Sequence, residues 1–150
     1  MRHLLLLPLL LTACMHDAGP RKALADAVNN MNDAARWGRI GTAVGLVDAS
    51  YQMRFVEAHD GWGESIQLAD SDVVQVDMTD ENTATAVVAY SWYNLRTMTL
   101  HNTVVQQRWV SADEDFTLAS EIVIKGDTNL FAPPADPAEE QAERATAEPR

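Results

Sequence analysis

The sequence has very little cysteine and little positive charge, and both shortages narrow the classes of protein that it can encode. Its 150 residues include one cysteine, Cys14, which excludes a disulfide framework or a cysteine-rich zinc site within one chain. Its 11 basic residues are outnumbered by 22 acidic residues, for a formal net charge of -11. Because such a field repels a phosphate backbone, we do not expect nucleic acid as a partner.

Motifs that carry chemistry are also missing. The sequence has no nucleophile motif, no glycine-rich phosphate loop and no paired cysteines, which argues against a dedicated enzyme. The histidines are scattered at His3, His16, His59 and His101, so we predict no metal site and no cofactor. A hydrophobic content of 47% with 22% charged residues is nonetheless typical of a globular domain with one packed core.

The most informative segment is the N-terminus. Arg2 precedes an apolar run at residues 4–11 that is too short to span a bilayer and is typical of a cleaved export signal. Residues 11–14 read Leu-Thr-Ala-Cys and resemble the lipobox of bacterial lipoprotein signals. That resemblance implies that residues 1–13 are removed and that Cys14 becomes an acylated N-terminus. The alternative, an ordinary secretory signal cut after Ala13, would require a small residue in place of Leu11.

Lipidation would determine where the protein resides. Each buried methylene contributes about 0.8 kcal/mol, so two or more acyl chains anchor durably. In the best-known sorting systems of this family, an aspartate after the cysteine retains the protein in the inner membrane. This sequence has Met15 there, so we expect an anchor in the outer membrane, facing the periplasm. Residues 14–19 would then form a short linker to the domain.

The residues after the linker predict helices. Apolar residues at spacings of four, three and four predict a helix from residue 20 that ends near Gly38; they are Leu24, Val28, Met31 and Ala35. We also predict helices at residues 40–47 and 49–59, with Asp48 as the cap of the latter. The triplet at residues 61–63, Gly-Trp-Gly, predicts a turn that returns an aromatic side chain to the core.

The second half of the domain predicts a sheet. β-Branched and aromatic residues with a period of two accumulate in four runs, at residues 72–79, 83–95, 98–110 and 116–124. The connections are too short for parallel crossovers, so the strands form an antiparallel meander. The second and third runs exceed a typical strand, which predicts that they bend or bulge around the helices. The predicted class is α+β, with N-terminal helices packed on a curved four-stranded antiparallel sheet.

Helices followed by long curved antiparallel strands resemble the superfamily named after nuclear transport factor two, also called SnoaL-like. The residues that carry this resemblance are Ser-Trp-Tyr-Asn-Leu at 91–95 and Val-Val-Gln-Gln-Arg-Trp at 104–109. The resemblance implies a cone-shaped domain over residues 20–131. Members often carry a tryptophan in the final strand, whereas residues 113–116 read Asp-Glu-Asp-Phe here, so we expect Phe116 to replace it in the core.

Enzymes of that superfamily usually place an aspartate, histidine or tyrosine inside the cone, where desolvation shifts its pKa. The candidates for a pocket in this sequence are Tyr51, Asp77, Tyr90, Trp92 and His101. An aromatic pair on one strand alternation more often fills a core, which is the interpretation we prefer for Tyr90 and Trp92. For His101 we expect the exposed face, beside Thr99 and Thr103. No catalytic residue is therefore predicted.

The C-terminal residues 132–150 combine four prolines with five acidic residues, which predicts a disordered acidic tail. The leading hypothesis is a lipid-anchored, non-catalytic binding or scaffold module that works with another envelope protein or a small apolar ligand. One alternative is a pocket enzyme of the dehydratase or isomerase type, for which a buried, pKa-shifted acid/base pair would be diagnostic. The other is an acidic partner that sequesters a basic protein.

Overall fold

The computed structural model describes residues 19–112 and 115–131, so the predictions for the lipobox and the acidic tail lie outside the described residues. Helices come first, four strands follow, and a short 3-10 helix ends the described part. The elements are α1 (Pro20–Arg36), α2 (Ile40–Ala43), η1 (Val44–Leu46), α3 (Gln52–Ala58), β1 (Ile66–Met78), β2 (Thr83–Asn94), β3 (Leu100–Ala112), β4 (Asp115–Gly126) and η2 (Thr128–Phe131). Within this described part, none of the helices combines the length and the apolar character needed to span a bilayer.

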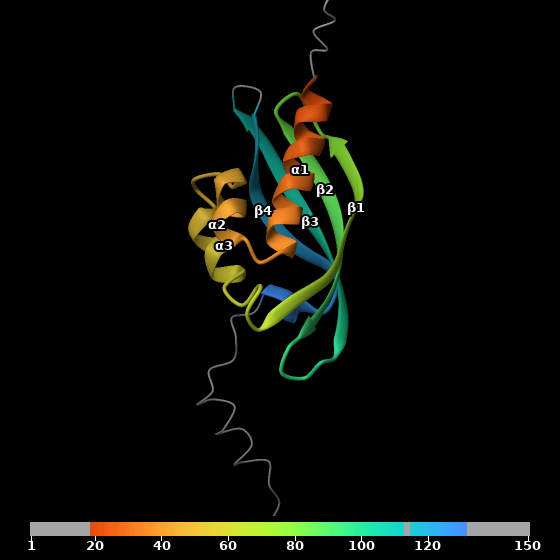
Figure 1. Ribbon diagram of the computed structural model, residues 1–150. Helices are drawn as coiled ribbons and strands as arrows, with labels where there is room; N and C mark the ends of the chain where they lie inside the picture. Colours follow the sequence, from red (N-terminus) through yellow and green to blue (C-terminus); the bar gives the residue numbers. More distant parts are fainter. Residues whose placement is uncertain (1–18, 113–114, 132–150) are drawn as a thin grey trace, which may run out of the picture.

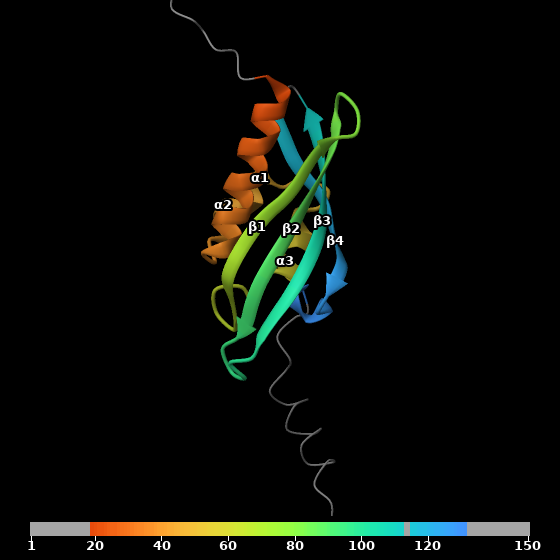
Figure 2. The ribbon, with the colours of Figure 1, turned by 90° about the vertical axis from the view of Figure 1, so that its right-hand side faces the viewer.

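The four strands form one sheet in the order β1-β2-β3-β4, and each pair of neighbours is antiparallel. The sheet curves, and α1 lies along its concave side with α2 and α3 beside it (Figure 1). When the sheet faces the viewer, the helices lie behind or beside it as a second layer (Figure 2). The predicted α+β class with a curved four-stranded meander is confirmed.

Bulges give the sheet its curvature. The β1–β2 register shifts between Leu68 and Asp70 and again between Val73 and Gln75, and the β3–β4 register also shifts twice. The β2–β3 ladder runs from residue 83 to residue 93 of β2 without a shift. An extra residue on one strand bends that strand and increases its twist. The two outer strand pairs therefore wrap around the helices while the central ladder stays continuous.

The first strand begins earlier than the sequence predicted. We placed its start at residue 72, whereas β1 begins at Ile66 and pairs with the end of β2. The segment at residues 67–71 reads Gln-Leu-Ala-Asp-Ser and has no β-branched residue, so its local propensity for a strand is weak. Its pairing with β2 and the burial of Ile66 and Leu68 override that propensity.

The predicted stripe of α1 forms the helix side of the core. Leu24, Val28, Met31 and Ala35 are all at most 1% exposed, as the spacing required. Over the first part of β2 the interior face carries small or branched side chains, namely Ala84, Ala86 and Val88. Full burial of a large aliphatic side chain stabilises a fold by about 1.5–3 kcal/mol. This stripe therefore supplies much of the free energy that holds α1 inside the sheet.

A contact between two glycines brings the end of α1 to the turn before β1. Gly38 has a φ of +65°, Gly63 has a φ of +84°, and a Cβ built on Gly38 would lie 2.8 Å from the Cα of Gly63. Both the conformation and the close approach require glycine. Trp62, beside this contact, is 3% exposed, so the predicted return of an aromatic side chain to the core is confirmed.

The predicted cap of the third helix is wrong. Helix α3 begins at Gln52, and its capping residue is Tyr51, which makes no side-chain capping hydrogen bond. Asp48 Oδ1 instead accepts a hydrogen bond of 3.0 Å from the backbone N–H of Ser50, which closes a turn before the helix. An aspartate side chain can accept a hydrogen bond from a nearby backbone N–H either as a helix cap or within a turn. Asp48 accepts it within the turn.

Candidate functional site

A network of polar side chains lies inside the curved sheet, where apolar packing is the rule. It takes Asn32 from α1, Tyr90 from β2, Gln107 from β3, Glu121 from β4, and His59 from the end of α3. Asn32, Gln107, Tyr90 and His59 are each at most 2% exposed, and the Glu121 side chain is 1% exposed. Five segments that are distant in sequence therefore converge on one buried polar cluster.

Two amide side chains connect the helix to the sheet. Asn32 Nδ2 donates to the carbonyl oxygen of Val28 at 2.8 Å and to Gln107 Oε1 at 3.1 Å. Gln107 Nε2 lies 3.0 Å from Asn32 Oδ1 and 3.0 Å from Glu121 Oε1, and it donates to both. The Tyr90 hydroxyl donates to Asn32 Oδ1. The buried amides are thus satisfied, which stabilises one arrangement of α1 against β2 and β3.

Glu121 is the charged group of this network. Burial raises the pKa of its carboxyl to about 7, because the ionised form loses its hydration, and the hydrogen bond from Gln107 opposes part of that shift. Among the described residues, its second oxygen, Oε2, has no hydrogen-bond partner. An unsatisfied buried polar atom costs about 1–3 kcal/mol, so this atom needs an explanation in terms of function or proton state.

His59 faces that unsatisfied oxygen. Its Nδ1 lies 2.7 Å from the carbonyl oxygen of Phe55, which can only accept, so Nδ1 carries the ring proton and Nε2 presents a lone pair. Nε2 is 3.4 Å from Glu121 Oε2, beyond a normal hydrogen bond. Burial lowers the pKa of His59 to about 4 and raises that of Glu121 to about 7, so between these two pH values the imidazole is neutral and the proton of the pair resides on the Glu121 carboxyl.

Aromatic rings surround the Glu121–His59 pair. Phe55 stacks on the His59 ring at 3.9 Å between centroids, and Trp62 and Phe131 meet the same ring edge-on at 4.3 and 5.0 Å. Tyr51 is half-buried nearby, and burial together with the charge of Glu121 raises its pKa to about 12. These walls lower the local dielectric constant, which explains why both pKa values move toward the neutral form.

The short helix η2 closes this end of the molecule. It lies below α1, next to the start of β1 (Figure 1). Trp62 Nε1 donates to the carbonyl oxygen of Leu130 at 3.0 Å, and the Leu130 side chain is fully buried. The Phe131 ring is nearly parallel to the Trp62 ring, with an interplanar angle of 6°. In this closed form the acid/base pair does not contact solvent.

A second cluster lies farther along the sheet. His101 stacks on Trp92 at 4.5 Å, and its Nδ1 lies 2.6 Å from Asp127 Oδ2. Trp92 Nε1 donates to Thr103 Oγ1, which donates to the backbone carbonyl of Asp127. The expectation that His101 lies on the exposed face is wrong, because it shares the face of buried Thr103 and Trp92. The contacts of this cluster hold the residue after β4, Asp127, against β3.

A glycine allows the end of β4 to lie this close to β3. Gly126 has a φ of +93°, and a Cβ built on it would lie 2.1 Å from the backbone oxygen of Asn102. Only glycine permits the backbone of β4 to approach β3 so closely before it turns into Asp127 and η2. The position of the closing helix therefore depends on this residue.

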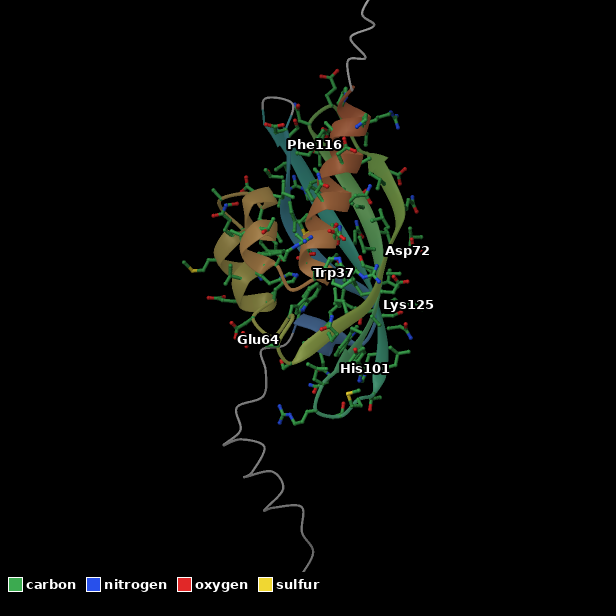
Figure 3. All side chains as sticks on the ribbon, viewed as in Figure 1. Trp37, Glu64, Asp72, His101, Phe116 and Lys125 are labelled. Atoms are coloured by element: carbon green, nitrogen blue, oxygen red, sulfur yellow. The ribbon has the colours of Figure 1, made fainter. Side chains whose placement is uncertain are left out.

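The structure divides the five pocket candidates among three places. Tyr51 and Tyr90 lie at the buried polar network, where each is affected by the charge of Glu121. Trp92 and His101 belong to the second cluster, which Figure 3 places toward the lower end of the sheet, far from Phe116 at the upper end. Asp77 is exposed on β1 and accepts a hydrogen bond from Gln75. Core packing of Tyr90, Trp92 and Phe116 is confirmed, since each is at most 3% exposed.

The sequence did carry signals for part of the network that we did not predict. Asn32 interrupts the apolar stripe of α1, and Gln107 falls on the same strand alternation as Val105 and Trp109, which are buried. A polar residue at an apolar position is a recognisable sign of a buried hydrogen bond. Glu121 has no such signal, because the bulge between Arg108 and Trp109 changes which β4 residues face inward.

A metal centre is not formed within the described ranges 19–112 and 115–131, where no three side chains of the ligating types gather. What the buried network can do chemically is hold and move one proton. A protonated carboxyl beside a bare imidazole nitrogen offers a hydrogen-bond donor and an acceptor next to each other. The same pair could act as a general acid and base if a substrate reached it.

No protein-family model matches the chain, and no curated protein sequence matches it. Solved structures do match its fold. An NTF-2 like protein of unknown function from Shewanella oneidensis is 9% identical, with a TM-score of 0.52 over 70% of this chain and 98% of that one. A protein of unknown function from Mycobacterium tuberculosis is 12% identical, with a TM-score of 0.55 over 87% and 94%.

A third similar structure is a protein of unknown function with a cystatin-like fold from Nostoc punctiforme. It is 7% identical, with a TM-score of 0.52 over 72% of this chain and 91% of that one. At these identities the likeness concerns the fold alone. The chain thus has the cone-like α+β fold of NTF-2 like and cystatin-like proteins, as the resemblance in the sequence implied.

Proposed function

We propose that this protein is a lipid-anchored module of the bacterial cell envelope that binds another envelope protein and does not itself catalyse a reaction. The lipobox at residues 11–14 supports the anchor, with Cys14 as the acylated residue. The absence of aspartate at position 15 supports the outer membrane, with the domain in the periplasm. The closed cone supports binding over catalysis, because the Glu121–His59 pair does not contact solvent.

The observation that carries the proposal is an exposed apolar tip. Leu95, Met98 and Leu100 are 44%, 68% and 61% exposed, and they lie at the connection between β2 and β3. This connection is at the opposite end of the molecule from the start of α1 (Figure 1). A chain tethered just before α1 would therefore present the tip away from its membrane, where a protein partner could cover it.

The test is a pull-down from the native envelope with the full-length protein. We expect one specific partner with the native protein and its loss when the three tip residues are all replaced by serine. Met53→Ser is the matched control, because Met53 is 75% exposed on α3, and this variant should retain the partner. Cys14→Ser should release the protein from membranes. Retention of the same proteins by the tip variant would refute the proposed surface.

The buried pair favours one second candidate, a pocket enzyme of the dehydratase or isomerase type. Glu121 and His59 lie 3.4 Å apart, with pKa values of about 7 and about 4, and such perturbed pairs concentrate at functional sites. Catalysis would require the closed end of the cone to open. In that event Glu121 would act as the acid and His59 as the base.

This candidate is tested by incubating the protein with small molecules extracted from the envelope and analysing them by mass spectrometry. A turnover product should appear with the native protein and disappear with Glu121→Gln. Glu64→Gln is the control, because Glu64 is exposed and lies outside the network. If the native protein and Glu121→Gln yield the same products, the pair has no catalytic role.

A further inference from the structure

Trp37 is a large aromatic side chain that the fold leaves uncovered. It is 62% exposed, whereas the other three tryptophans are at most 3% exposed; they are Trp62, Trp92 and Trp109. It follows the last residue of α1, and Figure 3 labels it near the lower end of that helix, well above the tip at the β2–β3 connection. A single exposed apolar residue is common on a protein surface. What distinguishes Trp37 is that its ring is held in one orientation.

Hydrogen bonds and ion pairs hold that ring in place. Its indole Nε1 donates to Asp33 Oδ1 at 3.1 Å, and Asp33 Oδ2 accepts from Arg39 at 2.7 Å. The Arg36 guanidinium lies over the ring, 5.6 Å from its centroid, and is itself paired with Asp70 of β1 at 3.2 Å. Because Arg36 occupies one face of the ring, the exposed area belongs to the opposite face and the edge. A ring that is already fixed loses little conformational entropy when a ligand stacks on it.

We propose that the free face of Trp37 binds a sugar ring of a neutral glycan chain. The C–H bonds on one face of a pyranose stack on the indole ring, and hydroxyl groups at the edge of the sugar bond to Asp33 and Arg39. A carboxylate has about four lone-pair sites, of which Trp37 and Arg39 occupy one each on Asp33. The Arg39 guanidinium adds further N–H donors. This site goes beyond the proposed function, which concerns the tip at the β2–β3 connection, and does not depend on it.

The charges around the ring select a neutral, polar ligand. Asp33 is paired with Arg39, and Arg36 is paired with Asp70, so the two positive and two negative charges sum to zero. A cation would be repelled by the guanidinium that already lies over the ring. An anion would find both guanidinium groups already paired with carboxylates. The core of a protein interface is depleted in charged residues, so a ring framed by four of them suits a ligand rich in hydroxyl groups better than a protein surface.

The experiment titrates two neutral oligosaccharides, chitohexaose and cellohexaose, into the full-length protein and records the indole N–H signals by NMR. The Trp37 signal, assigned from its loss in Trp37→Phe, should shift saturably, while the signals of the three buried tryptophans stay in place as internal controls. Trp37→Ala should fold, because the ring lies outside the core, and should weaken binding at least about ten-fold. Asp33→Ala, which frees the ring and removes an acceptor, should weaken binding about three-fold to ten-fold. Met53→Ala is the matched control, because Met53 is 75% exposed on α3, and this variant should bind as the native protein does.

Several results would overturn the proposal. One is the absence of a saturable shift of the Trp37 signal with both oligosaccharides, and another is equal affinity of the native protein and Trp37→Ala. Polyethylene glycol of similar length has C–H bonds but no sugar ring, so an equal shift with it would show general stickiness. If neither oligosaccharide binds and Trp37→Ala loses a protein in the envelope pull-down, the ring is a protein contact. The variant with serine at the three tip residues should bind the oligosaccharides normally, so this proposal and the proposed function fail separately.

Discussion

The Glu121–His59 pair makes the stability of this protein respond to pH in a way that single substitutions reveal. The Glu121 pKa is about 7 in the folded protein, against an ordinary value of 4.5. Its raised pKa gives stability that is fully present below pH 4.5 and is lost as pH rises to 7. One pKa unit corresponds to about 1.4 kcal/mol, so the loss is about 3 kcal/mol.

His59 has the opposite dependence. Its pKa is about 4 in the folded protein, against an ordinary value of 6.5. This depressed pKa gives stability that is present above pH 6.5 and is lost as pH falls to 4, again about 3 kcal/mol. Between pH 4.5 and 6.5 the pair therefore holds one proton in both the folded and the unfolded chain. In the native protein the two effects cancel over that interval.

Replacing one residue of the pair reveals the pH dependence of stability that the other residue causes. We expect Glu121→Gln to lose about 3 kcal/mol of stability as pH falls from 7 to 4.5, because only His59 still titrates. We expect His59→Gln to lose about 3 kcal/mol as pH rises from 4.5 to 7.5, because only Glu121 does. The main cause of each shift is burial, which persists without the partner.

The assay is urea unfolding followed by tryptophan fluorescence at several pH values, each variant being compared with the native protein. That comparison subtracts the titration of all other groups, and Glu64→Gln serves as the exposed control. The two variants should deviate from the native profile with opposite slopes. If both follow the native profile within about 1 kcal/mol, the buried pair does not carry the assigned protonation states.

Three further predictions concern stability and are checked by thermal or urea unfolding. Gly126→Ala should destabilise the protein by about 2–4 kcal/mol, because the residue has a positive φ and its new Cβ would clash with β3. The control is Gly45→Ala, which has open space at its Cβ and should change stability by less than about 1 kcal/mol. Equal effects of the two substitutions would contradict the close approach of β4 to β3. Tyr90→Phe should cost about 1–2 kcal/mol by removing the donor to Asn32, and a neutral result would mean that the hydroxyl is not bonded. Leu118→Ala should cost about 2–5 kcal/mol, since Leu118 is fully buried, and a loss below about 1 kcal/mol would mean that the site collapses freely.

Local patterns in the sequence were enough to predict most of the fold. The spacing of Leu24, Val28, Met31 and Ala35 predicted the buried face of α1, and short connections predicted the antiparallel meander. Both features depend on the period of a helix or strand and on loop length, which are local properties. The Gly-Trp-Gly turn at residues 61–63 was predictable for the same reason, because glycine alone tolerates the backbone that the turn needs.

The candidate site was decided only by the tertiary structure. Asn32, His59, Gln107 and Glu121 are separated widely in sequence, and they meet because α1 and the end of α3 pack inside the sheet. Bulges, which alternation cannot predict, turn Glu121 inward and let β1 begin at Ile66. The sequence by itself determined the order of helices and strands and the antiparallel layer that the strands form. Which side chains lose their water, and therefore which protons the core holds, followed from packing across distant segments.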